Sequence, residues 1–434
     1  MIMNVQEIFF DNMNYLLKCA NIFNKNSIFN SSQKTLSRKI AVGVSGGADS
    51  IALTILMSRY AEFYGFDVLT YTVNHNLREG ALQEALYVNL LMQKFGIKHK
   101  ILHWEHEDIK FGHIENEARK ARYDLLRNAM CEDECDILLT AHTENDLAET
   151  FLLRKIKHST KTGLAGISAL RDFGCGKVLI RPLLNIKKDR LVEFLNSINI
   201  TWVHDPSNDD EKFQRVKIRK ILSAKSRFHE LIMKKVKHLS TIRQKIEFDL
   251  YKFMVGNVFF DRNLLSVEVL RKTFYEYVYR LELLQNLIMI IGGAEYPVNF
   301  SKCLDKLYKF KKFTHGKCVI DFSEHYVKIY RENKGFKKLK KGDSNFFDNR
   351  IFVRFIHKNS FFVDAIGKNN LIQMYEKKKL ANLKNLEQKS VLPAVFSRDL
   401  EILFVHGLNY KKDDLEWADI EFGRSFIPFV SIYH

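Results

Sequence analysis

The stretch Ser45-Gly46-Gly47-Ala48-Asp49-Ser50 decides the fold of this chain. It directly follows the apolar run 40–44 and directly precedes the apolar run 51–56, so a buried strand, a glycine turn and a helix start come in succession. Adjacent glycines let the backbone approach an anion closely, and the amides that open the helix can donate to it together with the serine hydroxyls. The stretch therefore predicts a cradle for a nucleotide phosphate.

Two common phosphate cradles do not fit this stretch. A Walker loop ends in Gly-Lys-Ser/Thr and the dinucleotide fingerprint reads G-x-G-x-x-G, and SGGADS matches neither pattern. It is instead the SGGxDS signature of the PP-loop ATP pyrophosphatases. That resemblance implies cleavage of ATP to AMP and pyrophosphate, with adenylation of an oxygen on the substrate. A serine- and glycine-rich turn with a purely structural role is the alternative reading.

Short apolar runs alternate with helical patterns from residue 39 to about residue 205, which is typical of β-α units around a parallel sheet. The expected strands are 40–44, 68–73, 100–104, 137–141 and 178–181. The expected helices are 50–64, 79–95, 114–130, 145–156 and 188–198. We therefore predict an α/β fold, with a parallel-sheet PP-loop domain over 39–220 that is Rossmann-like and similar to the adenine nucleotide α-hydrolases. Ligands of such sheets bind at the carboxyl ends of the strands.

Length, charge and cysteine content limit the classes of protein and of binding partner that fit this chain. The chain has 434 residues, which favours two or three domains, and its 68 Lys and Arg exceed its 51 Asp and Glu to give a formal charge of +17. Such an excess favours a polyanion partner, although a merely basic protein would show the same balance. No signal peptide or membrane span is indicated, and six cysteines without a regular framework suggest reduced thiols, so we expect a soluble, cytoplasmic protein. Metal ligation by Cys131 and Cys135 is not favoured, because no second pair completes a zinc site.

Polar residues follow the expected strand 137–141. His142 comes at the strand end, and Asp146 and Glu149 lie three residues apart on one face of the next helix. Paired carboxylates beside an ATP cradle can bind an amine or help to remove its proton. Taken singly, each residue also has an ordinary explanation, as a solvated acid or a structural histidine.

Further motifs occur in order along the chain and make the resemblance specific. They are SGGADS at 45–50, VNHNLREGA at 73–81, EARKARYDLL at 117–126, TAHTENDLAETFLLR at 140–154, GLAGI at 163–167, RPLL at 181–184 and WVHDPSNDDEKFQRVKIR at 202–219. This series resembles the bacterial tRNA(Ile)-lysidine synthetases. The W-x-x-DPSN-x-D-x-x-F block is the part that separates this family from other PP-loop enzymes.

The resemblance implies a particular reaction. ATP adenylates the C2 oxygen of the wobble cytidine in an isoleucine tRNA with a CAU anticodon, and free L-lysine then attacks C2 through its ε-amine and expels AMP. The product, lysidine, pairs with A, so that the tRNA reads AUA. The resemblance thus implies a ligase that forms a carbon–nitrogen bond, with ATP and Mg²⁺ as cofactors and tRNA(Ile) and L-lysine as partners. It also suggests a homodimer and no contact with a membrane.

The resemblance gives each candidate residue a role. Ser45, Gly46, Gly47, Ala48, Asp49 and Ser50 hold the ATP phosphates. Asp49 acts through Mg²⁺, His142 lies near the reacting phosphate, and Asp146 and Glu149 receive the lysine amine, whose reference pKa is ~10.4. Arg122 and Arg219 stabilise phosphate charge or position the tRNA backbone, although structural ion pairs explain these arginines equally well.

The chain departs from the family pattern at three positions. Asn145 replaces the first of two usual aspartates, Asn74 replaces a frequent aspartate, and Val216 replaces a frequent asparagine. An active enzyme is still predicted, because the acids and the histidine named above remain. The alternatives are a PP-loop tRNA thiolase, which would need cysteines or an iron–sulfur cluster, a small-metabolite synthetase, which leaves the charge unexplained, and a tRNA-binding protein without catalytic activity.

The periodicity changes beyond the PP-loop domain. Residues 221–333 carry helical patterns rich in Lys, Arg and Phe and predict a mainly helical domain that contacts tRNA, with a hairpin near 316–330. A solvated helix face explains any single lysine there as well. A basic linker is expected over 334–349 and a small α+β domain that binds tRNA over 350–434, with a family-like segment at 393–403. Residues 1–38 are expected to form an N-terminal extension that includes an amphipathic helix.

Overall fold

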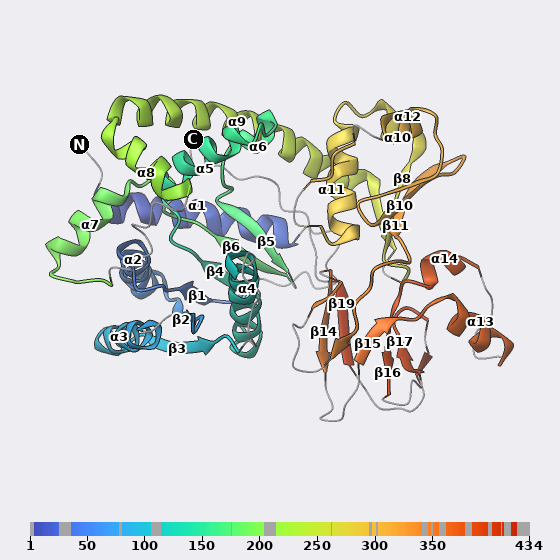
Figure 1. Cartoon of the computed structure of the whole chain (residues 1–434), viewed down its shortest axis with the longest axis horizontal. Helices are drawn as coiled ribbons and strands as arrows, with labels where there is room; N and C mark the ends of the chain where they lie inside the picture. Colours follow the sequence, from blue (N-terminus) through green and yellow to red (C-terminus); the bar gives the residue numbers. More distant parts are fainter. Residues whose placement is uncertain are drawn as a thin grey trace.

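The computed structural model describes most of the 434-residue chain. The described residues are 4–25, 36–77, 80–105, 114–174, 176–203, 214–261, 263–294, 297–300, 303–340, 346–348, 350–355, 362–377, 384–397, 402–408, 410–411 and 418–422. Figure 1 shows an α/β half at the left and a half rich in antiparallel strands at the right.

Six strands form the sheet of the α/β half, in the order β3-β2-β1-β4-β6-β5. Their bounds are β1 Lys39–Gly43, β2 Asp67–Asn74, β3 Lys98–His103, β4 Ile137–Leu139, β5 Leu170–Gly174 and β6 Lys177–Ile180. All pairs are parallel except the edge pair of β5 and β6. The predicted parallel α/β sheet is confirmed. Strand β5 was not anticipated, because Leu-Arg-Asp-Phe-Gly contains no continuous apolar run.

Helices cover both faces of this sheet and follow the predicted order. They are α2 Ala48–Tyr64, α3 Ala81–Lys94, α4 Ile114–Glu132, α5 Glu144–Ile156 and α7 Lys188–Ser197. Alternate residues of β1 point to opposite sides, so that Ile40 and Val42 pack with α2 while Ala41 packs with α4. Burial on both faces explains why the strand sequences are almost continuously apolar.

The N-terminal helix α1 (Val5–Lys25) belongs to the core of the α/β half. Phe9, Met13 and Leu16 are fully buried, and each such side chain contributes about 1.5–3 kcal/mol through burial. Asn12 donates to the Pro182 carbonyl at 2.8 Å, which ties the helix to the RPLL segment. The N-terminal region thus packs as an integral layer of this half.

The GLAGI segment fixes helix α5, which carries the candidate acids. Arg154 of α5 donates to the carbonyls of Gly163 and Gly166 at 2.6 and 2.7 Å. Gly166 has φ +86°, and a Cβ there would lie 2.9 Å from the Leu147 side chain of α5. A larger residue would therefore push α5 away from this segment, which includes the short helix α6 (Lys161–Leu164).

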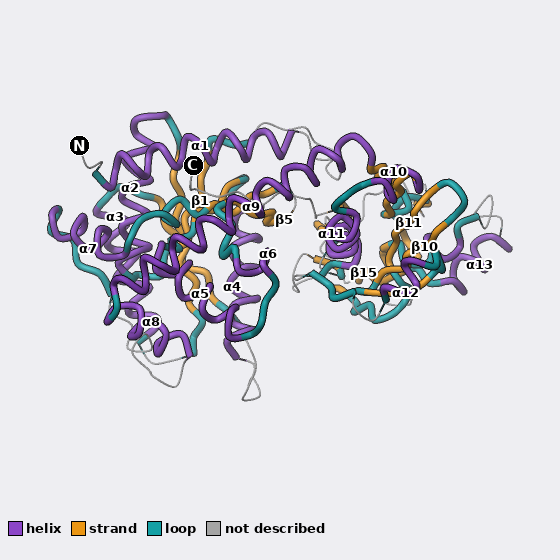
Figure 2. Tube along the Cα trace, turned by 90° about the horizontal axis from the view of Figure 1, so that it is seen from above, coloured by secondary structure: helices purple, strands orange, loops and turns teal. Residues whose placement is uncertain are grey.

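Helix α9 (Ser226–Asn257), which follows α8 (Gln214–Ala224), links the two halves. Val236 belongs to the core of the α/β half, whereas Leu250 and Met254 belong to the core of the other half. Figure 2 shows this helix running from one body toward the other. Its lysines at 234 and 235 are exposed.

The second half contains three antiparallel sheets, in the orders β7-β8-β11-β10-β9, β12-β15-β16-β17-β18 and β13-β14-β19. The strands of the first sheet and its helices are β7 Val258–Asp261, β8 Ser266–Leu270, α10 Arg271–Glu276, α11 Arg280–Gly292, α12 Leu304–Tyr308, β9 Phe313–His315, β10 Cys318–Phe322 and β11 Tyr326–Arg331. The remaining elements are β12 Leu339–Lys340, β13 Phe346–Phe347, β14 Ile351–Phe355, β15 Phe362–Ala365, α13 Lys368–Glu376, α14 Leu386–Lys389, β16 Pro393–Phe396, β17 Ile402–Val405, β18 Tyr410–Lys411 and β19 Ala418–Phe422. One hydrophobic core runs through all three sheets.

Two expectations for the second half need correction. Residues 221–333 contain helices α9 to α12, as expected, but they also include a five-stranded sheet, of which only the hairpin of β10 and β11 is predicted from the sequence. The apolar alternation of β7 and β8 is obscured by Phe259 and Leu270, which are 66% and 52% exposed. The expected linker 334–349 contains β12 and β13. Residues 398–401 of the family-like segment and 423–434 lie outside the described residues.

None of the described helices combines the length and apolar character that a bilayer crossing requires. Within the described part, no disulfide includes Cys19, Cys131, Cys135, Cys303 or Cys318. The sixth cysteine, Cys175, lies outside it.

Candidate active site

The SGGADS turn lies between β1 and α2, at the carboxyl edge of the sheet. Gly47 is the N-cap of α2 and makes no side-chain hydrogen bond to the helix start, so the first amides of the helix keep their capacity to bind an anion. The hydroxyls of Ser45 and Ser50 lie 3.3 Å apart, and Ser50 donates to the Gly47 carbonyl at 2.9 Å. The structure thus gathers Ser45, Ser50 and the helix start around one turn, as a phosphate cradle requires.

Gly46 is required at its position in the turn. Its φ is +85°, and a Cβ would lie 3.1 Å from Val203 and 3.2 Å from Val88. The Val203 amide donates to the Gly46 carbonyl at 2.9 Å, which ties the turn to the segment before the DPSN block. Residues 204–213, which hold that block, lie outside the described residues.

Asp49 follows in the first turn of α2 and is incompletely paired. Its side chain is 24% exposed, Oδ2 lies 3.6 Å from Nζ of Lys188, and Oδ1 is buried without a hydrogen-bond partner. Burial raises the pKa of Asp49 to about 6, although the Lys188 charge acts in the opposite direction. An incompletely paired carboxylate beside a phosphate cradle is therefore available to a cation or to a substrate.

The donor set at Asp49 fits Mg²⁺. This ion prefers oxygen ligands and binds through one or two carboxylates together with waters and substrate phosphates, so a cluster of protein ligands is not needed. No cluster of three or more metal-ligating side chains occurs among the described residues. Asp49 Oδ1 is the atom that would hold the ion, which would supply positive charge to a departing phosphate.

Asn145 positions Lys188. Its Oδ1 accepts a hydrogen bond from the Lys188 amide at 3.0 Å, and Lys188 is the first residue of α7. An aspartate could accept the same bond, so the departure from the family pattern keeps this contact.

The other two departures from the family pattern also fit their surroundings. Asn74 accepts a hydrogen bond from the Asn76 amide at 3.0 Å, and Val216 is buried at 7% exposure on α8. Each of the three departures is thus compatible with its surroundings.

His142 lies after β4, at the same edge of the sheet. Its Nδ1 is 3.1 Å from the Thr140 hydroxyl. Burial, and next the charge of Arg181, lower the pKa of His142 far below its usual value. The imidazole is therefore neutral at pH 7 and can exchange hydrogen bonds with a substrate without adding charge.

Asp146 and Glu149 project from α5 toward two arginines of α8. Asp146 Oδ2 accepts from the amide and hydroxyl of Thr143, both at 2.9 Å, and so caps α5, while its Oδ1 lies 3.9 Å from Arg215. Glu149, 2% exposed, binds Arg219 at 2.9 Å and lies 3.4 Å from Arg215. The predicted acids are brought together and both face arginines, although Oε2 of Glu149 accepts no hydrogen bond from any described residue.

The two arginines named from the sequence lie in different surroundings. Arg219 pairs with Glu149, a contact that raises the Arg219 pKa. Arg122 belongs to α4, on the opposite face of the sheet, where burial lowers its pKa and its guanidinium carbon is 5.7 Å from the Tyr123 ring centroid. Arg122 thus contacts an aromatic ring rather than the paired acids.

Sequence reasoning missed Lys188 and Arg215 as members of the site. Lys188 is the closest cation to Asp49 that the structure gives, and Arg215 bridges Asp146 and Glu149. A usable signal was the spacing of Arg215 and Arg219, which places them on one face of a helix opposite two acids with helical spacing.

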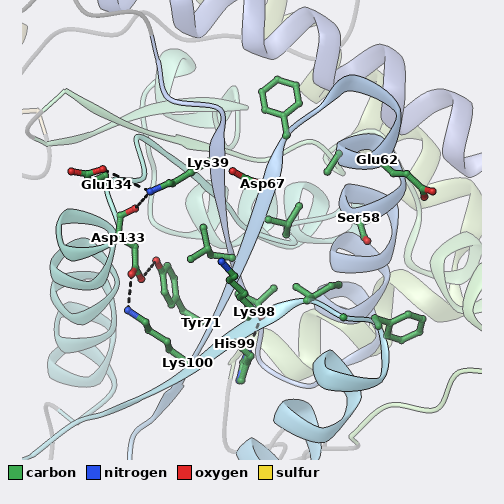
Figure 3. Close-up of a pocket in the computed structure, with 18 of the residues that line it drawn as sticks. Lys39, Ser58, Glu62, Asp67, Tyr71, Lys98, His99, Lys100, Asp133 and Glu134 are labelled. Atoms are coloured by element: carbon green, nitrogen blue, oxygen red, sulfur yellow. Dashed lines mark hydrogen bonds and ion pairs between the residues drawn. The ribbon is translucent and has the colours of Figure 1, made fainter.

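A cavity of about 690 Å³ lies elsewhere, at the amino edge of the sheet (Figure 3). Lys39, Tyr71, His99 and Asp133 are among the residues that line it. It opens beside the starts of β1, β2 and β3, at the opposite ends of the strands from the SGGADS turn. The cavity is therefore separate from the candidate active site.

The fold and the turn define a PP-loop protein, and the PP-loop domain family matches residues 19–225. A tRNA(Ile)-lysidine synthase from Orientia tsutsugamushi is 33% identical over 314 residues, 68% of this chain and 70% of that protein. One from Rickettsia akari is 29% identical over 411 residues, 90% of this chain and 94% of that protein. The chain belongs to the tRNA(Ile)-lysidine synthase family and is therefore an enzyme of the ligase class.

The solved structure of U34-tRNA thiolase NcsA from Methanococcus maripaludis is also similar, with a TM-score of 0.40 and 16% identity over 53% of this chain and 79% of that chain. This similarity is too low to bear on function.

Proposed function

We propose that this enzyme joins free L-lysine to C2 of the wobble cytidine of tRNA(Ile) with a CAU anticodon. Family membership supports the substrate class. The observation that carries the chemistry is Asp49, whose Oδ1 is left unpaired beside a turn built for phosphate. A cradle that only bound nucleotide would gain nothing from an incompletely paired carboxylate at this position, whereas a cradle that releases pyrophosphate needs a held cation.

In the first step, the C2 oxygen of cytidine attacks the α-phosphate of ATP, a P–O bond forms, and pyrophosphate leaves. The SGGADS turn holds the phosphates through the amides at the start of α2 and the hydroxyls of Ser45 and Ser50. Neutral His142 donates or accepts a hydrogen bond near the reacting phosphate. Adenylation is required because the free C2 oxygen is a poor leaving group, whereas AMP is a good one.

In the second step, the ε-amine of lysine attacks C2, the C2–O bond breaks, and AMP leaves. Asp146 and Glu149 bind the lysine ammonium, and one of these carboxylates acts as the base that accepts its proton before the amine attacks. Arg215 is the partner that the lysine replaces, because its contacts of 3.4 and 3.9 Å are longer than the 2.9 Å contact of Arg219. Arg215 is also 47% exposed, so that it can return to solvent.

The one closely spaced pair of cysteines does not support sulfur transfer. Cys131 and Cys135 lie at the end of α4 and just beyond it, where Cys135 neighbours Tyr71 and Asp133. Asp133 contacts Lys39 at the start of β1, which is the amino edge of the sheet. These two thiols are therefore remote from the turn that would activate the base.

The test is incorporation of radiolabelled lysine into a tRNA(Ile) transcript with a CAU anticodon, in the presence of ATP and Mg²⁺. An elongator methionine tRNA, which carries the same anticodon, is the matched control. Labelling of the isoleucine tRNA alone supports the proposal. ATP cleavage to AMP that depends on tRNA but gives no lysine label would exclude lysine as the nucleophile.

A further inference from the structure

Four arginines lie close enough to Tyr123, at the carboxyl edge of the sheet, for their charges to act on its phenol. Arg119 and Arg122 come from α4, Arg171 comes from β5, and Arg181 directly follows β6. The guanidinium carbons of Arg119 and Arg122 lie 5.1 and 5.7 Å from the Tyr123 ring centroid, and Arg119 also donates to the phenol oxygen at 3.4 Å. Three separate elements thus bring positive charge to one place, which we call the arginine cluster.

The four arginines all act on the same phenol. Burial alone would raise the pKa of Tyr123, yet the four arginines bring it below its ordinary value. Among the described ion pairs, no member of the cluster has an acidic partner. On the same helix, by contrast, Arg127 pairs with Asp124 at 2.8 Å. Arg119 and Arg122 thus differ from Arg127, which is paired with an acid on the same helix.

Arg181 forms the buried floor of the cluster. It is 4% exposed, and its Nη1 donates to the Ser168 carbonyl at 2.7 Å, but its Nε is buried with no hydrogen-bond partner. A buried guanidinium without a counter-charge is costly, and an unpaired donor adds to that cost. Arg119 and Arg171 are exposed, so an anion can reach the cluster from solvent.

We propose that the arginine cluster binds backbone phosphates of the RNA substrate, at a subsite separate from the SGGADS turn. The inference rests on the proposed function insofar as the substrate is RNA. The nucleotide phosphate already has the donors of the turn, which lies at the start of α2, whereas the cluster adjoins α4 on the other face of the sheet. Four positive charges also exceed the need of one phosphate group and suit a polyanion.

This subsite would position the RNA rather than read its sequence. Phosphate contacts fix the orientation of a nucleic acid without recognising bases. The charges of Arg181, Arg119 and Arg122 each lower the pKa of His142, so the cluster lies close to the reacting groups. Phosphates held there would keep the anticodon loop in place while one unstacked base enters the site.

The experiment compares Arg119→Gln and Arg171→Gln with the control Arg38→Gln. Arg38 is exposed like the other two and loses the same charge, but it immediately precedes β1 at the amino edge. Binding of a tRNA(Ile) transcript without ATP is measured over a series of salt concentrations. Each cluster variant should bind RNA roughly tenfold more weakly, with a salt slope reduced by about 0.7, and the control should match the wild type.

A second set of measurements separates the RNA phosphate from the nucleotide phosphate. Binding of pyrophosphate and the KM for ATP should be unchanged in Arg171→Gln, and Arg171→Lys should recover most of the RNA affinity. Unchanged RNA affinity with a raised KM for ATP would assign the cluster to the nucleotide and overturn the proposal. RNA binding is measured without ATP and so does not depend on turnover. If the wild type binds RNA through the cluster but incorporates no lysine, only the proposed function is refuted.

Discussion

Charged side chains at the two edges of the six-stranded sheet differ in how completely they are paired. At the amino edge, Asp133 receives hydrogen bonds from Lys100 at 2.7 Å and from Tyr71 at 2.8 Å, and Lys177 donates to the Cys135 carbonyl at 2.6 Å. At the carboxyl edge, Asp49 keeps one oxygen unpaired, and the arginine cluster has no acid among the described residues. Unsatisfied polar groups reduce stability, and at this edge a substrate that pairs with Asp49 and with the arginine cluster would offset that cost.

The largest expected effect comes from removing the unpaired charge itself. Asp49→Asn keeps the shape of the side chain but cannot hold a cation beside the phosphates. We expect the rate of ATP cleavage to AMP to fall by roughly 10³-fold, since an electrostatic contribution of about 4 kcal/mol is lost. The measurement is formation of AMP from labelled ATP with tRNA present. RNA affinity should stay within twofold of the wild type, and a variant with normal turnover would remove Asp49 from the mechanism.

Glu149→Gln should have the next largest effect. Glu149 combines features of both edges. Its side chain is buried, as is common for an active-site acid, but it contacts two arginines, as a structural acid would. The change leaves Arg215 and Arg219 without their common carboxylate and removes a negative charge from the lysine site. We expect lysine incorporation to fall by roughly 10²-fold, with the KM for lysine raised. A loss of thermal stability without any change in the KM for lysine would make Glu149 purely structural.

How much of the site the sequence predicts depends on how local each contact is. The SGGADS turn and the acids of α5 were found because each follows an apolar strand within a few residues. Lys188 and Arg215 were missed, because their partners Asp49 and Glu149 lie far away in the chain. A single sequence holds no periodicity that joins α7 to α2 or α8 to α5.

The same limit applies to whole elements. The arginine cluster draws on α4, β5 and the residue after β6, and β5 itself has too few consecutive apolar residues to be recognised. In the second half, strand β7 was not recognised because its residue Phe259 is apolar but faces solvent, which breaks the alternation expected of a strand. Parallel strands buried on both faces give a stronger sequence pattern than antiparallel strands with one wet face.

The third prediction concerns stability and its pH dependence at the carboxyl edge. The pKa of Asp49 is raised from 3.8 in its ordinary environment to about 6 in the folded protein, so the folded state binds this proton more tightly than the unfolded chain. Ionisation therefore costs stability as the pH rises from about 4 to 6, and the full cost of about 2–3 kcal/mol is present above that range. Asp49→Asn should raise the Tm at pH 7.5.

The control for this prediction is the same pair of proteins at pH 4. There the wild-type carboxyl is already protonated in the folded state, so the difference in Tm should nearly vanish. An Asp49→Asn variant that is less stable than the wild type at pH 7.5 would show that the contact with Lys188 outweighs burial.

The smallest expected effect lies at the amino edge and has the opposite sign. Partial burial would raise the pKa of Asp133, but hydrogen bonds from Lys100 and Tyr71 bring it below its ordinary value. The charged carboxylate therefore stabilises the fold at neutral pH, and this stability is lost as the pH falls through the folded pKa. Because Lys100 is 48% exposed, Asp133→Asn should cost only about 1 kcal/mol at pH 7.5, measured by urea unfolding.

Asp133→Asn should leave both lysine incorporation and RNA affinity unchanged. The two aspartate variants are matched in chemistry, yet at pH 7.5 one should gain stability and lose activity while the other loses stability and keeps activity. If Asp133→Asn also impaired turnover, unpaired charge would no longer distinguish the functional edge of the sheet from the structural one. The cavity beside Asp133 would then need to be tested as part of the reaction site.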